Sequence, residues 1–327
     1  MYFDLTEDQK EIKRVAHELL ADRSPMSRVR EAAESDAYEP ELWREIVGLG
    51  WPGIAVAEEH GGQDLGAVEL AVLAEELGYA CAATPFLSTA VAASVIQACG
   101  SDEQRGRWLP GLVSGELTAG VGSPELAADV VGAAVVVMLD GDDARLLESP
   151  EAEAITTIDS TRRYGSVSGS GDPLGAGAAD RVRAALAAEV VGISQRALDM
   201  TLAYVKDRKQ FGVPVGSFQA VSHRCAQMLL HTESARSTAY FAAWAADADP
   251  ERLPEAAALA AAAAAEGGRE VTASAIQAHG GIGFTWEADV HRLYKRAQLD
   301  SALLGGARRH RQALARMVAA RVALAAH

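Results

Sequence analysis

The sequence is poor in aromatic residues and in basic charge. Only 6% of its 327 residues are Phe, Trp or Tyr, and 30 Lys and Arg stand against 45 Asp and Glu, which gives a formal net charge of −15. Binding to nucleic acid favours a basic face, so this charge argues against nucleic acid as the natural partner. A nucleotide cofactor remains compatible with this charge, because it needs only a local cation.

Cysteines and long apolar runs are also scarce. Cys81, Cys99 and Cys225 are odd in number and widely spaced, which predicts no disulfide framework and no metal site and favours a reducing cytoplasm. No apolar run is long enough to cross a bilayer, and the N-terminus lacks the basic and apolar stretches of a signal peptide. We therefore expect a cytoplasmic chain without a membrane partner, whose 49% apolar content allows a large core.

The chain divides into three regions that differ in predicted secondary structure. Residues 1–116 predict a helical domain with capping boxes at Thr6 and Ser101 and helices over 41–49 and 68–77. Residues 117–176 predict a small β domain, with a hairpin of 130–139 and 144–147 and further strands at 155–158 and 164–168. Residues 177–327 predict helices again, over 181–204, 221–246, 253–278, 287–296 and 306–324.

One segment of the third region combines a cation with an aromatic ring. In residues 204–219, YVKDRKQFGVPVGSFQ, Gly212 and Pro214 predict the end of a helix with Arg208 in its last turn. The planar guanidinium of Arg208 beside Phe211 suits a diphosphate next to a flat ring system. By itself, Arg208 could equally complement a helix dipole.

A second segment, residues 277–284 with the sequence QAHGGIGF, ends another predicted helix on glycines. Gly280, Gly281 and Gly283 have no Cβ, so backbone N–H groups there can approach an anion closely. By itself, this segment could equally be an ordinary helix C-cap.

Taken together, R-x-x-F-G followed about seventy residues later by Q-x-x-G-G resembles the C-terminal domain of acyl-CoA dehydrogenases. Residues 57–62, 75–78, 100–104 and 108–110 are similar to the N-terminal domain of that family. The resemblance implies a mainly α fold with a small β domain: an N-terminal helical domain, a truncated β domain and a C-terminal four-helix bundle. It also implies FAD bound mainly by a neighbouring subunit, with its ADP half held by Arg208, Gln210, Phe211, Phe218, Gln277, Gly280 and Gly281.

The chain departs from the family where the chemistry takes place. Its β region is several dozen residues short, and no Trp lies between Trp108 and Trp244 to cover a flavin as in the family. Much of the family keeps the Glu that removes the substrate α-proton in a loop Y-E-G-T, and here Leu304 occupies that position. The catalytic residue therefore stays unassigned, with Glu233 as a candidate and Asp247 and Asp300 behind it.

These departures resemble the small, non-catalytic subunits of actinobacterial heteromeric α2β2 acyl-CoA dehydrogenases, several of which act on steroid side chains. The resemblance implies α,β-desaturation of an acyl-CoA thioester, fatty or steroid, with the base and flavin cover on a larger partner subunit. Two alternatives stay open at this point. One is a self-sufficient homo-oligomeric dehydrogenase with Glu233 as a relocated base, and the other is a structural paralogue that has lost the flavin.

Overall fold

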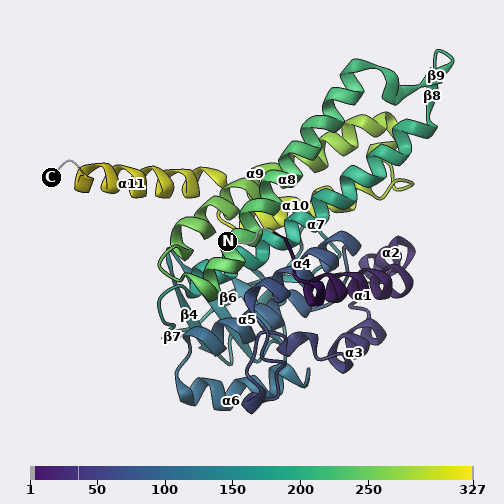
Figure 1. The fold of residues 1–327 in the computed structure, drawn as a ribbon. Helices are drawn as coiled ribbons and strands as arrows, with labels where there is room; N and C mark the ends of the chain where they lie inside the picture. The colour runs from purple at the N-terminus through teal and green to yellow at the C-terminus, as the bar shows by residue number, and fades with distance from the viewer. Residues whose placement is uncertain (1–3, 36, 326–327) are drawn as a thin grey trace.

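The computed structural model describes residues 4–35 and 37–325, and six helices form its N-terminal region (Figure 1). They are α1 (Glu7–Arg23), α2 (Met26–Ser35), α3 (Pro40–Gly48), α4 (Ala67–Ala80), α5 (Phe86–Cys99) and α6 (Asp102–Val113), with short 3-10 turns η1 (Trp51–Gly53) and η2 (Glu58–His60). Both predicted capping boxes are confirmed: Thr6 pairs with Gln9 and Ser101 with Gln104.

A seven-stranded sheet follows, in the order β5-β6-β2-β1-β3-β4-β7. The strands are β1 (Ala119–Gly122), β2 (Ala127–Ala128), β3 (Val135–Asp140), β4 (Asp143–Glu148), β5 (Glu151–Ile155), β6 (Tyr164–Ser168) and β7 (Asp172–Pro173). Strands β1 and β3 pair in parallel, and every other pairing is antiparallel. The predicted hairpin is confirmed as β3–β4, turning at Gly141 and Asp142.

Two of the predicted strand bounds are wrong. The first strand of the hairpin begins at Val135 instead of residue 130, because Asp129 and Gly132 have φ of 58° and 81° and interrupt the extended backbone. The strand expected at 155–158 lies earlier, at Glu151–Ile155, where it pairs with β6.

The C-terminal region is a bundle of long helices. It contains α7 (Ala178–Asp207), α8 (Gln219–Ala248), α9 (Leu253–His279) and α10 (Val290–Leu303), and α11 (Ala307–Ala325) extends away from the bundle in Figure 1. Short elements join the long helices: β8 (Lys209–Gln210), β9 (Val213–Pro214), η3 (Val215–Ser217) and η4 (Gly280–Phe284). The helix predicted at 287–296 starts later and runs longer than expected, as α10.

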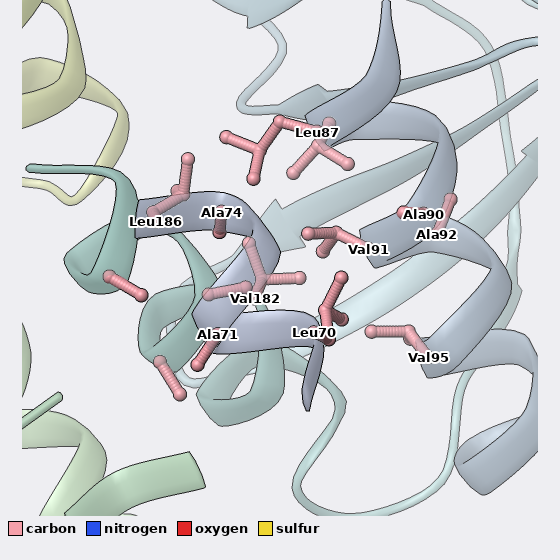
Figure 2. Close-up of a cluster of buried hydrophobic side chains, with 14 of the residues drawn as sticks. Leu70, Ala71, Ala74, Leu87, Ala90, Val91, Ala92, Val95, Val182 and Leu186 are labelled. Carbon is pink, nitrogen blue, oxygen red and sulfur yellow. The ribbon is translucent and has the colours of Figure 1, made fainter. Parts of the chain in front are cut away.

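The bundle meets the N-terminal region through glycines. A Cβ on Gly192 of α7 would lie 1.8 Å from the carbonyl oxygen of Glu75, and one on Gly78 of α4 would lie 2.2 Å from that of Glu189. The backbones of α4 and α7 therefore touch, which only glycine permits at both positions. Figure 2 shows the apolar core beside this crossing, where side chains of α4, α5 and α7 converge: Leu70, Ala74, Leu87, Val91, Val182 and Leu186.

All three cysteines are free, with Cys81 and Cys225 buried. Among the described residues, no helix is both long enough and apolar enough to span a membrane. The domain boundaries at residues 116 and 176 remain predictions.

Candidate functional site

The segment that carries Arg208 is a hairpin, and the prediction of a helix ending at Gly212 is wrong. Helix α7 ends at Asp207, and Arg208 follows it with extended φ and ψ of −65° and 123°. Strands β8 and β9 then pair across a two-residue turn of Phe211 and Gly212, whose φ values are 53° and 82°. Two successive positive φ values are what a tight two-residue hairpin requires. The turn holds the Phe211 ring outward, 93% exposed.

In the second segment, α9 ends at His279, and the three glycines that follow differ in conformation and in packing. Gly280 has φ 65° and ψ −141°, a conformation that side chains other than glycine rarely adopt. A Cβ on Gly283 would lie 2.5 Å from the carbonyl oxygen of Ile276, so this glycine is needed for packing. A Cβ on Gly281 would meet nothing within 4 Å. The open space in front of Gly281 is therefore not explained by packing within this chain.

An aromatic stack brings the two segments together. The ring of Tyr204, in the last turn of α7, stacks on the imidazole of His279 with centroids 4.4 Å apart and planes 21° from parallel. His279 is buried, and its Nδ1–H donates to the carbonyl oxygen of Ala275 at 2.8 Å. Burial lowers the pKa of His279 below its ordinary value, which favours the neutral ring in the stack.

Sequence reasoning missed both rings of this stack. The only signal was their position, since Tyr204 precedes R-x-x-F-G by four residues and His279 stands inside Q-A-H-G-G. A second link joins α8 to α9 beside it, where Arg224 donates to Ser274 Oγ at 3.4 Å. The structure therefore places the two predicted motifs at one end of the bundle, which we call the bundle tip (residues 204–219 and 277–284).

The predicted cofactor residues at the bundle tip are exposed. These are Arg208, Gln210, Phe211, Phe218, Gln277, Gly280 and Gly281. Within the part of the chain that the structure describes, the guanidinium of Arg208 has no hydrogen-bond or ion-pair partner. The Phe211 ring meets only the edge of the Phe218 ring, with centroids 6.3 Å apart, and stays 93% exposed. A free guanidinium, an exposed ring and an open glycine suit an anionic ligand with a flat group. All of these groups lie on the surface of this chain.

Leu304, at the position of the family's catalytic Glu, and the acids considered in its place all have partners within the chain. Leu304 is buried at the end of α10, and its carbonyl oxygen accepts a hydrogen bond from His310 Nε2 at 2.6 Å. Glu233 is half exposed on α8 and accepts from Arg236 Nε at 3.1 Å. That arginine also binds Glu75 of α4, so the ion pair joins two helices.

The two remaining acids are also engaged. Asp247 Oδ2 accepts the backbone N–H of Ala67 at 2.6 Å and thereby caps α4, which satisfies one of the free N–H groups at the helix N-terminus. Asp300 is completely buried and accepts from Arg162 Nη1 at 3.2 Å. Each of the three acids therefore has a structural role within this chain, and only Asp300 is shut off from solvent.

Comparison with known proteins identifies the chain. Residues 170–319 match the family described as "Acyl-CoA dehydrogenase, C-terminal domain", and residues 6–116 match "Acyl-CoA dehydrogenase, N-terminal domain". Acyl-CoA dehydrogenase IpdE2 of Mycolicibacterium smegmatis is 35% identical over 306 residues, which cover 92% of this chain and 96% of that protein. The chain belongs to the acyl-CoA dehydrogenase family.

Solved structures agree with this assignment. A Tcur3481–Tcur3483 steroid ACAD variant superposes with a TM-score of 0.87 at 30% identity, covering 97% of this chain and 99% of that one. The ChsE4–ChsE5 complex from Mycobacterium tuberculosis gives the same TM-score at 24% identity, covering 98% and 99%, and supports the fold. The predicted mainly α fold of acyl-CoA dehydrogenase type is confirmed, and members of this family are FAD-dependent flavoproteins.

Proposed function

We propose that this chain is a FAD-binding subunit of a heteromeric acyl-CoA dehydrogenase, which acts on a fatty or steroid acyl-CoA thioester. The observation that carries the proposal is the bundle tip, where a recognition set for a diphosphate and a ring is assembled but left uncovered. A scaffold that had lost its flavin would have no use for an unpaired Arg208 beside an exposed Phe211.

The residues of the bundle tip fit the ADP half of FAD. Arg208 would bind the diphosphate with its planar fork of donors, and Phe211 would pack against the adenosine part. Gly280 and Gly281, together with Gln277, would present backbone and amide groups from the other side of the Tyr204–His279 stack. When bound, FAD supplies the hydride acceptor for α,β-desaturation, and these side chains orient it.

The base comes from a partner subunit in this proposal. Leu304 cannot accept a proton, and Glu233, Asp247 and Asp300 are each engaged in an ion pair or a helix cap, which favours a base on another subunit. A larger acyl-CoA dehydrogenase subunit would supply both the base and the cover for the flavin. Two structural relatives, Tcur3481–Tcur3483 and ChsE4–ChsE5, are each named as a pair of different chains, which supports this arrangement. The three free cysteines suit a reducing compartment, and we place the assembly in the cytoplasm.

A self-sufficient homo-oligomer with Glu233 as its base is the competing function. The position of Glu233 in the Arg236 ion pair between α8 and α4 argues against it, because a base must be free to approach the substrate. The position does not exclude assembly of two copies through the bundle tip, which would still cover the flavin.

The decisive experiment compares the chain alone with the chain expressed beside its larger partner. Visible absorbance reports bound flavin, and an electron-acceptor assay with fatty and steroid acyl-CoA thioesters reports turnover. We expect turnover only from the assembly, unchanged by Glu233→Gln in this chain. Turnover by the chain alone that Glu233→Gln abolishes would establish the homo-oligomer. An assembly that never carries flavin would establish the scaffold.

A further inference from the structure

The junction between the β region, α7 and α10 is filled with buried charge. Six carboxyl and guanidinium side chains there are at most 5% exposed: Asp129, Asp159, Arg162, Glu189, Arg296 and Asp300. They come from the segment after β2, the loop before β6, and the two helices. Carboxyl groups outnumber guanidinium groups by two, and an uncompensated buried charge is costly. This excess favours a cluster that retains at least one proton.

The hydrogen-bond donors identify which carboxyl groups are ionised. Asp159 accepts four hydrogen bonds, from Arg296 Nε at 2.7 Å, Tyr164 OH at 3.0 Å, and both Thr161 N and Thr161 Oγ1 at 2.9 and 2.5 Å. A carboxyl group with four donors and no acceptor nearby is satisfied only as the anion. Burial opposes this ionisation, yet the Arg296 guanidinium and the Thr161 bonds hold the pKa of Asp159 below its ordinary value.

Asp129 and Glu189 are also bound by donors. Each oxygen of Asp129 accepts from a hydroxyl group, one from Tyr38 and the other from Ser88 at 2.6 Å. Oε1 of Glu189 accepts from both buried arginines, from Arg162 Nη2 and from Arg296 Nη1 at 3.0 Å. Both groups are placed as acceptors, and burial nevertheless raises the pKa of Asp129 above its ordinary value.

Asp300 differs from the other three carboxyl groups. Its Oδ1 accepts one hydrogen bond, at 3.2 Å from Arg162 Nη1, and its Oδ2 is buried without a partner in the described residues. The second oxygen of Glu189, Oε2, is likewise buried and unpartnered there. Because one guanidinium, that of Arg162, binds both carboxyl groups through its two terminal nitrogens, the two groups lie side by side. A proton on one of them would reduce the excess of buried negative charge and allow a hydrogen bond between the two carboxyl groups.

We propose that Asp300 is a neutral carboxylic acid in the folded protein, and that its proton is donated to Glu189. This bond adds to the contact between α10 and α7 that Arg296 and Glu189 already make, while Arg162 ties both helices to the β region. Burial and the negative charge of Glu189 raise the pKa of Asp300 well above its ordinary value. The other titratable groups facing Asp300 are Arg162, Arg296 and Asp159, and Tyr164 contributes a hydroxyl whose pKa burial also raises. The inference does not depend on the proposed flavin chemistry.

Two isosteric substitutions in the same cluster have opposite expected results. In Asp300→Asn, the amide oxygen can still accept from Arg162 and the amide N–H can donate to Glu189, so the neutral acid is reproduced. In Asp159→Asn, an N–H group must face donors from Arg296, Thr161 and Tyr164, which leaves buried donors unpaired. We expect Asp300→Asn to fold as well as the wild type and Asp159→Asn to unfold at a clearly lower urea concentration.

Infrared spectroscopy of the whole chain tests the proton directly. At neutral pH the wild type should show the carbonyl stretch of a protonated carboxylic acid, shifted in D2O, and Asp300→Asn should lack it. Asp289→Asn, which removes another buried carboxylate that is bound by Arg30, is the matched control and should keep the band. Absence of the band in the wild type, or its survival in Asp300→Asn, would overturn the proposal.

The pH dependence of unfolding provides a second readout. The folded chain holds one proton that the unfolded chain releases above the ordinary Asp pKa of about 4. Stability from this group is therefore complete below that pH and is lost as pH rises toward the raised folded pKa. Above pH ~5, the unfolding equilibrium constant of the wild type should rise about tenfold more per pH unit than that of Asp300→Asn. Identical pH slopes for the two proteins would contradict the bound proton.

Discussion

The two glycines Gly281 and Gly283 offer a test of the bundle tip that separates ligand binding from packing. Both glycines lie in η4, and neither has a positive φ, so alanine can adopt either backbone conformation. At Gly283 a new Cβ would meet the Ile276 carbonyl oxygen at 2.5 Å and His279 Cβ at 3.1 Å. Overpacking of this kind costs about 1–3 kcal/mol of folding free energy. At Gly281 the space is open, so the cost in stability should stay within ~0.5 kcal/mol.

For flavin binding, the larger effect is expected at Gly281 and not at Gly283. If the backbone of Gly281 approaches the FAD diphosphate, Gly281→Ala should remove at least one hydrogen bond to a charged group, worth about 1.5–3 kcal/mol. That free energy corresponds to a loss of about 10- to 150-fold in FAD affinity. The assay is flavin absorbance of the purified assembly during dilution, beside thermal unfolding of the same samples. Wild-type FAD retention by Gly281→Ala would refute the placement of the diphosphate at this backbone.

Much of the fold could be predicted from local sequence signals. The capping boxes at Thr6 and Ser101 fixed the starts of α1 and α6, since they depend on residues three apart. Helix α5 was not predicted, because Phe86 to Ile96 are all buried and a helix buried on every side has no apolar periodicity. The β8–β9 hairpin was predicted as a helix end, because glycine, here Gly212, occurs commonly both after helices and in tight turns.

The two motifs of the site could be predicted from the sequence, but the way in which they meet in space could not. Resemblance to a family assigned Arg208 and Gly281, although nothing in either segment indicated that they meet. The Tyr204–His279 stack that joins them links residues seventy-five positions apart, and such a contact has no local signature. The Asp300–Glu189 junction is similar in this respect, because its members lie on α7 and α10, more than a hundred residues apart, and only tertiary packing brings them together.

Three further predictions concern the bundle tip. Arg208→Ala should lower FAD affinity by about one to two orders of magnitude, because charge-assisted bonds to a phosphate are lost. The control is Arg44→Ala, at an exposed arginine on α3 that is distant in sequence from the bundle tip, and it should leave FAD affinity unchanged in the same absorbance assay. Size-exclusion chromatography with light scattering should show a dimer or larger assembly, alone or with a partner; a 34.3 kDa monomer that binds FAD tightly would contradict the need for a covering surface. Finally, the stack should respond to acid. Burial lowers the pKa of His279, so the folded state prefers the neutral ring, and the stability this contributes is complete above the unfolded value near 6.5 and is lost as pH falls through the lower folded value. Acidification below about pH 6 should therefore increase hydrogen exchange at the ends of α7 and α9, and His279→Gln should remove this dependence. Exchange at the tip that ignores pH in the wild type would mean that the imidazole does not hold the two segments together.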